Sequence, residues 1–468
     1  MNNKIRKPKS LGVFALVMIN IIAVDNLRSL PFSAAFGFSL VFYYLLAAIV
    51  FFIPIALVAA ELATGWPDRG GIYVWVREAF GEWWAFFIIW LQWIYNVVWY
   101  PTILSFIAAE LAYLVNPHLA ESKIYMLSVI LILFWSATLI NCLGMKVSGA
   151  VSAVGAIIGV LLPILLISSL GMAWLGLGKG SQIHFTLENF FPRNININNM
   201  VFLVAVLFGL IGVEMSAVHA NEVDNPGRAF PRAILISTII IFVTLVLASL
   251  SIAIVIPTQK INVVTGLTQA FSLFFSAWNM EWMNPIMVIL IVIGAIAGVA
   301  AWIIGPSKGL FVAARDGHAP TILSYENKYG VPVAILILQG LIVTALCSVF
   351  LLMPNVNSSY WLLTVMTAQL ALLVYVGLFA AAIYLRYKKP NVHRAYRVPG
   401  GNIGMWIICL LGTLASIAAI ILGFFPPAQL TTGSLARYET ILAAGSIILC
   451  LPPLVICFLH YIKNKTAT

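Results

Sequence analysis

The first apolar segment of the chain is interrupted by Ala23-Val24-Asp25-Asn26-Leu27-Arg28-Ser29-Leu30-Pro31. Asp25, Asn26 and Ser29 carry short polar side chains that compete with a helix for backbone hydrogen bonds. Pro31 has no backbone donor and disfavours the helical conformation in the residue before it. The sequence therefore predicts a helix that opens near Asp25 to Ser29.

The composition indicates the environment of this interruption. Of the 468 residues, 62% are hydrophobic and only 9% are charged. Soluble globular proteins carry about 45–50% apolar and about 25% charged residues. The composition therefore excludes a soluble protein, a disordered chain, a disulfide scaffold and a nucleic-acid-binding module, and it predicts a membrane protein.

Apolar stretches long enough to cross a bilayer recur along the whole chain. A span needs about 20 apolar residues. Twelve such stretches are found, at approximately Leu11–Pro31, Leu40–Leu62, Trp84–Val115, Ile124–Leu143, Gly149–Leu175, Val201–Ala220, Ala233–Ile256, Pro285–Ala314, Val333–Met353, Tyr360–Tyr387, Ile403–Phe425 and Thr440–Tyr461. No loop between them approaches the roughly 50 residues that a soluble domain needs. The sequence therefore predicts an all-α polytopic membrane protein.

The basic residues are distributed unevenly between the two sides of the predicted membrane. With the N-terminus inside, nineteen of the 25 Lys and Arg residues fall at cytoplasmic ends or loops, five fall in outer loops, and Arg28 lies inside a span. The positive-inside rule then places both termini in the cytoplasm. The net charge of +10 is therefore an orientation signal and does not indicate a nucleic-acid partner.

A second interruption is predicted in the sixth span, at Leu207-Phe208-Gly209-Leu210-Ile211-Gly212-Val213-Glu214-Met215-Ser216. Unwound backbone at membrane depth is tolerated only where it lines a cavity enclosed by protein. Spans one and six are equivalent positions in two halves of five spans, the arrangement of an inverted repeat with a substrate site at the midplane. Broken helices offer N–H groups to an anion and carbonyl groups to a cation, which suits a zwitterionic amino acid.

Several motifs follow one another in a specific order along the chain. The most specific are Phe208-Gly-Leu-Ile-Gly-Val-Glu214 with Asn221-Glu-Val-Asp-Asn-Pro-Gly-Arg228, and Gly305-Pro-Ser-Lys-Gly309 with Arg315-Asp-Gly-His-Ala-Pro320. In order and spacing, over almost the whole chain, they resemble the amino acid/polyamine/organocation superfamily of transporters. Within it, the chain is most similar to the glutamate/gamma-aminobutyrate antiporter family.

The resemblance implies a fold of ten core helices in two inverted five-helix repeats, with helices 1 and 6 broken, plus two peripheral helices. The corresponding divisions are an N-terminus at 1–10, a core at 11–387 with repeats 11–175 and 201–387, peripheral helices at 403–461, and a tail at 462–468. It also implies secondary active transport of an amino acid by alternating access, as antiporter or permease, in a bacterial inner membrane. Protons are a candidate coupling ion, and the oligomeric state is left open.

The resemblance also implies which residues bind the substrate. The alpha-carboxylate and amino group are expected to contact the backbone at Asp25, Asn26 and Leu27 and at Phe208, Gly209, Leu210 and Ile211. Arg28 and Gly212, in the same two breaks, are further candidates for substrate binding. Phe208 is expected to act as an aromatic gate, and Trp302 as a second aromatic wall of the cavity with a gating role.

The charged pair in the first break departs from the Gly/Ser-rich break of much of the superfamily and leaves the substrate open. Asp25 and Arg28 lie three residues apart, so they either neutralise each other or contact the substrate. A free Arg28 favours glutamate or another anionic side chain. A free Asp25 favours a cationic one, so a permease for neutral or cationic amino acids or polyamines is the alternative.

Other polar residues inside spans have two interpretations each. Glu214 follows the second break and is either a coupling or gating residue that carries a proton during exchange, or a polar contact between helices. Glu61 and Glu110 lie near the ends of their spans, where hydration at the membrane interface is expected. Asn96 shares a helical face with Trp93 and Tyr100, and its amide can both donate to and accept from a substrate.

No residue pattern indicates a metal, a cofactor or an enzyme. The five cysteines lie in or beside apolar runs, as packing residues do. The six histidines are scattered, and no P-loop or dinucleotide fingerprint is present. The sequence therefore predicts no metal site, no cofactor and no catalytic residue.

Overall fold

The computed structural model describes residues 12–67, 71–143, 154–155, 157–192, 200–214, 223, 225–428 and 430–466, and within them it is helical without a strand. Nine helices in this part of the chain are long and apolar enough to cross a membrane, or up to ten with one bent pair. The predicted polytopic helical fold is thereby confirmed. The predicted cytoplasmic N-terminus at 1–10 lies outside the described residues.

The helices that build the bundle differ widely in length. They are α1 (Val13–Val24), α2 (Leu30–Ala34), α3 (Leu40–Ala47), α4 (Ile53–Gly65), α5 (Ile72–Phe80), α6 (Glu82–Val115), α7 (Lys123–Cys142), α9 (Leu162–Gly176), α10 (Leu187–Phe190), α12 (Phe202–Gly209), α13 (Pro226–Val255), α14 (Gly266–Ala277), α15 (Met283–Arg315), α16 (Val333–Leu346), α17 (Val349–Leu352), α18 (Val356–Lys388), α19 (Gly401–Leu422) and α20 (Leu435–Thr466).

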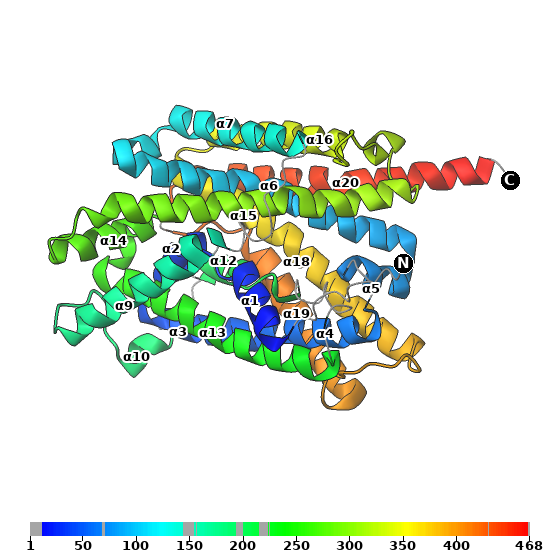
Figure 1. Cartoon of the computed structure of the whole chain (residues 1–468), viewed down its shortest axis with the longest axis horizontal. Coiled ribbons are helices and arrows are strands. Elements are labelled where there is room, and N and C mark those ends of the chain that lie inside the picture. The colour runs from blue at the N-terminus through cyan, green and yellow to red at the C-terminus, as the bar shows by residue number, and fades with distance from the viewer. Residues whose placement is uncertain are drawn as a thin grey trace, which may run out of the picture.

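Three long helices form the centre of the bundle. Helix α6 packs along both α15 and α18, and Figure 1 shows these helices running past the broken segments α1 and α12. In its most apolar window, 78% of α6 is buried, against 28% of α19 and 17% of α20. Most side chains that α19 and α20 expose beyond their first turns are apolar, as expected for helices that face lipid.

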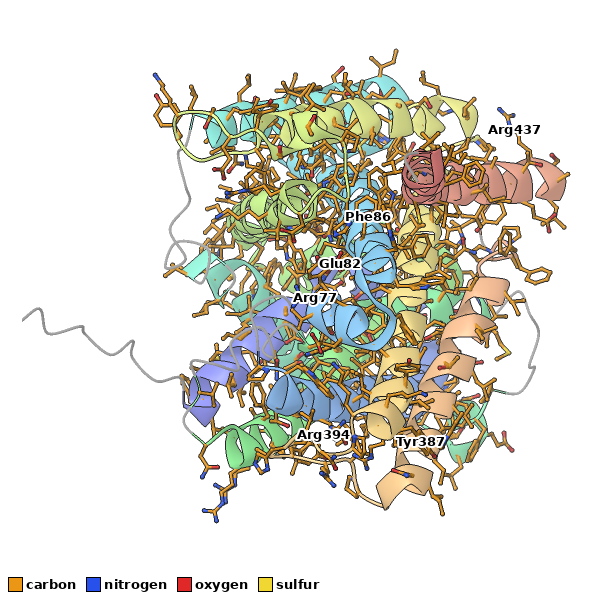
Figure 2. The ribbon with its side chains drawn as sticks, turned by 90° about the vertical axis from the view of Figure 1, so that its right-hand side faces the viewer. Arg77, Glu82, Phe86, Tyr387, Arg394 and Arg437 are labelled. Atoms are coloured by element: carbon orange, nitrogen blue, oxygen red, sulfur yellow. The ribbon has the colours of Figure 1, made fainter. Side chains whose placement is uncertain are left out.

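Several basic side chains gather at one end of the bundle. One end, named here the basic end, carries Arg77, Arg386, Lys389 and Arg394, and Figure 2 views the molecule from this side. The opposite end, named here the far end, carries α14 and the last turn of α6 (Figure 1). Helix α5 lies at the basic end as a short helix after the second span.

Two glycine pairs at GxxxG spacing, Gly155/Gly159 and Gly294/Gly298, lie where helices pack closely. A Cβ placed on Gly159 would lie 2.3 Å from the Cα atom of Gly294, so α15 approaches the Ile157–Leu161 segment at backbone distance. A Cβ on Gly155 would lie 2.5 Å from Ala297, whereas Gly298 faces open space. Three of these four glycines therefore serve packing.

Glu61 is not hydrated at an interface, and that prediction is wrong. Its side chain is 1% exposed, and its carboxylate pairs with Arg386 of α18 and with Arg394, whose Nε lies 3.3 Å away. The backbone N–H of Val398 donates to the other carboxylate oxygen at 2.7 Å. Burial lowers the pKa of Arg394, and the charge of Glu61 opposes that shift. This ionic cluster ties α4 to α18 and to the loop that follows it.

Replacing Glu61 by Gln is expected to lower the thermal stability strongly. Arg386 and Arg394 would stay buried without their counter-charge, and breaking a buried ion pair costs about 3–5 kcal/mol. Glu78→Gln is the matched control, because Glu78 and Lys389 pair at 2.5 Å with side chains 29% and 41% exposed. Such a pair contributes about 0–1 kcal/mol. Melting curves of both purified variants measure the difference, and equal shifts would contradict the assigned role of Glu61.

Candidate functional site

The first break occurs where the sequence predicts it. Helix α1 ends at Val24, residues Leu27–Ser29 form a short 3-10 turn, and the axis bends by 44° between α1 and the Leu27–Ala34 segment. The Asn26 side chain stabilises the new helical start, because its Oδ1 accepts from the N–H of Ser29 at 3.1 Å. The same amide donates from Nδ2 to the carbonyl of Val24 at 3.0 Å.

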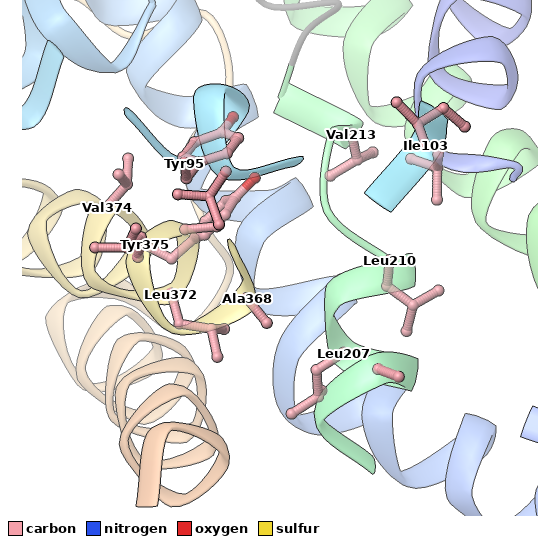
Figure 3. Packing of buried hydrophobic residues seen from close by; sticks show 14 of the residues in the cluster. Tyr95, Ile103, Leu207, Leu210, Val213, Ala368, Leu372, Val374 and Tyr375 are labelled. Carbon is pink, nitrogen blue, oxygen red and sulfur yellow. The ribbon is translucent and has the colours of Figure 1, made fainter. Parts of the chain in front are cut away.

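The second break lies directly against the first. Helix α12 ends at Gly209, and its carbonyl accepts from Asn26 Nδ2 at 3.5 Å. Gly212 has φ +121°, and a Cβ at that position would lie 3.0 Å from the carbonyl oxygen of Ala23. Figure 3 shows the chain leaving the helix near Leu210 and running as an open loop toward Val213, where a 3-10 turn begins. The predicted breaks thus meet, while Met215 and Ser216 lie outside the described residues.

Arg28 lies in this junction between aromatic rings. It is 7% exposed, and its Nη1 donates to Thr102 Oγ1 of α6 at 3.0 Å. Its guanidinium lies 4.9 Å from the ring centroid of Phe208 and 5.7 Å from that of Trp99. The ion pairs between described side chains do not include Arg28. The Tyr360 hydroxyl of α18 is a second partner of the Arg28 side chain. A guanidinium has more N–H donors than these two hydroxyl groups use, so donors remain available for a carboxylate.

Asp25 has a different partner from Arg28. Its carboxylate is 4% exposed, and Thr244 Oγ1 of α13 lies 3.3 Å from each of its oxygens. Asp25 is also the C-cap of α1, where the helix carbonyls are concentrated. The two charged side chains of the first break therefore contact opposite neighbours, α13 for Asp25 and α6 for Arg28.

The predicted polar face of α6 is occupied by contacts within the protein. Asn96 donates from Nδ2 to the carbonyl of Gln92 in its own helix at 2.7 Å. Trp93 donates to Gln339 at 3.2 Å, and the Tyr100 hydroxyl donates to the carbonyl of Trp302 at 2.9 Å. This last hydrogen bond ties α6 to α15 at Trp302. The ring of Trp302 lies 6.4 Å from that of Trp99.

Glu214 lies just beyond the second break and contacts α18. It is 5% exposed, and the Tyr375 hydroxyl donates to its Oε1 at 2.7 Å. Its Oε2 has no hydrogen-bond partner among the described residues. Tyr95 of α6 lies close enough to interact electrostatically with both groups, and Figure 3 shows Tyr95 and Tyr375 near each other. A buried carboxyl between two hydroxyl groups can bind and release a proton.

Several residues of this site carry no signal in the sequence. Thr102, Thr244 and Tyr375 stand in apolar helices like many other residues there, and each is more than 70 positions away from its partner. The one feature that could have suggested them is that each is a residue with a hydroxyl group inside an apolar span, and many other residues share that feature.

Comparison with known proteins identifies the family. The amino acid permease family model matches residues 10–446. The chain belongs to the amino acid permease family. It is 31% identical to a glutamate/gamma-aminobutyrate antiporter of Lactococcus lactis over 98% of this chain and 92% of the relative. It is 53% identical to an uncharacterised transporter of Legionella pneumophila over 95% and 96% of the two chains.

More distant relatives of this permease are also transporters. A probable agmatine/putrescine antiporter of Lactococcus lactis is 24% identical over 89% of this chain and 88% of the relative. A manganese transporter of Eremococcus coleocola has a similar fold, with a TM-score of 0.58, 10% identity and 99% coverage of both chains. The permease is therefore an integral membrane secondary transporter, and its relatives are transporters and not enzymes.

Proposed function

We propose that this permease exchanges amino acids of the glutamate/gamma-aminobutyrate type by alternating access. The observation that carries the proposal is Arg28, a buried cation at the junction of two broken helices without a carboxylate partner among the described residues. A bound carboxylate supplies the missing counter-charge, which is why an anionic substrate group fits this position. The antiporter name of the Lactococcus relative supports the same substrate class.

The substrate is proposed to lie across the two breaks. Carbonyl groups at the ends of α1 and α12 attract its ammonium group, and backbone N–H groups after the breaks attract its carboxylate. The proposed binding residues are Asp25, Asn26, Leu27, Arg28, Asn96, Phe208, Gly209, Leu210, Ile211, Gly212 and Trp302. Phe208 covers the Arg28 guanidinium in this structure, so its ring must move when a carboxylate binds there, which is the motion of a gate.

One observation favours a second candidate substrate class. Asp25 is a buried carboxylate whose side-chain partner is a single hydroxyl, that of Thr244. An ammonium group of a cationic amino acid or polyamine would neutralise it, and the relative named as an agmatine/putrescine antiporter carries the same suggestion. Neutral amino acids need neither charged contact.

The membrane orientation follows from the charge of the two ends. We propose that the basic end faces the cytoplasm, because basic residues concentrate on that side in membrane proteins. Both termini would then be cytoplasmic, in a bacterial inner membrane, and the far end would face outward. The core is proposed to span 11–387, with the 403–461 helices at its periphery.

Counterflow in proteoliposomes tests the proposed substrate. Vesicles loaded with glutamate or gamma-aminobutyrate are expected to accumulate labelled glutamate, whereas vesicles loaded with arginine, putrescine or leucine are not. The same vesicles without protein give the background. Accumulation driven by arginine or putrescine, but by neither acidic nor gamma-amino compounds, would overturn the first proposal and support the second.

Glu214 is proposed to carry a proton during exchange. Glu214→Gln keeps the shape of the side chain but cannot ionise, so we expect exchange whose rate no longer varies with pH between about pH 5 and pH 8. Tyr375→Phe removes one hydrogen bond to the carboxyl and is expected to slow exchange roughly tenfold while keeping the pH dependence. An unchanged pH profile in Glu214→Gln would exclude the proton role.

A further inference from the structure

Glu110, near the far end of α6, is a buried carboxyl that the proposed exchange does not use. It is 0% exposed, so the prediction of interfacial hydration is wrong. The Thr268 hydroxyl of α14 donates to its Oε2, and its Oε1 has no hydrogen-bond partner within the described part of the chain. The ion pairs found there do not include Glu110. Its carboxyl is therefore half satisfied and without a counter-charge.

Helix α14 is attached to α6 at two points with matching spacing. Thr268 contacts Glu110, and Thr265 interacts with the side chain of Tyr113, so both helices contribute residues three positions apart. On its other side α14 meets the first broken span, since a Cβ on Gly266 would lie 3.0 Å from Cβ of Pro31. Helix α14 thus connects α6 to the half-helix that follows the first break.

A cavity of about 380 Å³ lies beside this attachment. It is bounded by the end of α6, by α14 and by the start of α15, and its lining includes Thr268, Ser272 and Asn284. It also includes Leu114, which is 39% exposed. The volume holds several water molecules, and polar groups line it. Water in the cavity would therefore be separated from Glu110 by the Thr268 side chain.

The charged and titratable groups around Glu110 are few among the described residues. On its own helix it faces Tyr113, and the Pro117–Glu121 turn after α6 carries the titratable side chains of His118 and Glu121. From α18, Tyr360 interacts electrostatically with Glu110 and also with Arg28. The α14 and α15 residues at the cavity, including Thr268, Ser272 and Asn284, do not titrate. Arg28 is thus linked to Glu110 through Tyr360 and does not form an ion pair with it.

We propose that Glu110 is a proton-binding site at the far end and that its protonation holds α14 against α6. A proton taken from cavity water neutralises the carboxylate, which removes the cost of a buried charge without a cation. Loss of the proton to the same water restores the charge, for which the Thr268 hydroxyl is the one hydrogen-bond donor among the described residues. Cavity water is then drawn to the carboxylate, competes with Thr268 for it and loosens the contact between α14 and α6. In the proposed orientation the cavity faces outward. External acid therefore holds α14 against α6, and neutral external pH loosens α14.

Cysteine labelling at the cavity tests the proposal without any substrate. Ser272→Cys is reacted in intact proteoliposomes with a membrane-impermeant maleimide from about pH 5 to about pH 8, and each value is normalised to the unfolded protein at the same pH. Protein without this substitution gives the background of the five native cysteines. We expect labelling to rise several-fold with pH when Glu110 is present, and to stay low at every pH in Glu110→Gln.

Two further variants make the result decisive. Glu121→Gln is the matched acidic control and should keep the pH-dependent labelling. Thr268→Val removes the hydrogen bond between α14 and Glu110 and should give high labelling even in acid. This variant tests the proposal if Glu110→Gln fails to fold. A Glu110→Gln protein with the wild-type pH dependence, or a Thr268→Val protein with wild-type labelling, would overturn the proposal. Neither outcome bears on the exchanged substrate, which counterflow measures separately.

Discussion

Arg28→Gln is expected to slow glutamate exchange in proteoliposomes at least about 30-fold. The substitution removes the buried cation proposed to receive a substrate carboxylate, while Gln keeps a hydrogen-bond donor near Thr102. Truncating one partner of a buried charged pair costs about 2–5 kcal/mol, and each 1.4 kcal/mol corresponds to about tenfold. Initial rates of labelled glutamate counterflow at equal protein density measure the effect.

The matched control for this variant is Arg315→Gln. Arg315 ends α15 and is exposed, so its loss changes the net charge by the same amount without affecting the junction. Its exchange rate is expected to stay near the wild-type value. Melting curves show whether Arg28→Gln is folded. A folded Arg28→Gln protein that exchanges glutamate at the wild-type rate would remove Arg28 from the substrate site.

Gly212→Ala is expected to slow exchange about tenfold or more, because the substitution strains the backbone of the second break. Gly212 has φ +121°, a conformation that side-chain-bearing residues rarely adopt, and the added methyl would lie 3.0 Å from the carbonyl oxygen of Ala23. Such backbone strain costs about 1–3 kcal/mol. Because Ala23 belongs to the end of α1, the displacement would affect both breaks at once.

Gly298→Ala controls for the general effect of losing a glycine in a membrane helix. Gly298 lies inside α15 with nothing within 4 Å of an added Cβ, so exchange and stability should be unchanged or slightly improved. Counterflow and melting curves of the two variants give the comparison. If both alanine variants exchange at the wild-type rate, the geometry of Gly212 has no part in transport.

The two helix breaks were predictable because their causes are local. Asn26 and Ser29 stabilise the new helical start through a contact across three residues, and Gly212 adopts a φ of +121°, which residues with a side chain resist. Composition alone was sufficient to predict a polytopic helical protein. In each case the deciding residues are neighbours in the sequence.

The partners of the buried charges were not predictable, because they come from distant helices. Tyr375 is 161 positions from Glu214, Thr244 is 219 positions from Asp25, and Arg386 is 325 positions from Glu61. Position along a span indicates depth but not which face of the helix is buried. Hydration was therefore the expected state of Glu61 and Glu110, whereas an ion cluster and a hydroxyl contact are found.

On α6 the sequence predicts which residues share a face, but it does not predict what that face contacts. Trp93, Asn96 and Tyr100 do share one side of the helix, as their spacing predicts. Their polar atoms nevertheless bond to Gln339, to Gln92 and to the carbonyl of Trp302. Helical periodicity identifies a common face, but only the positions of α15 and α16 decide whether that face meets a neighbouring helix or a substrate.

Counterflow of glutamate and of glutamine tests the role of Arg28 most sharply, because glutamine has the same chain length but a neutral amide in place of the side-chain carboxylate. Four counterflow rates are needed, for each substrate in the wild-type protein and in Arg28→Gln. If Arg28 receives the side-chain carboxylate, the wild type prefers glutamate at least about tenfold, and the substitution slows glutamate exchange while leaving glutamine exchange nearly unchanged. Equal loss for both substrates, or a wild-type preference for glutamine, would contradict the account.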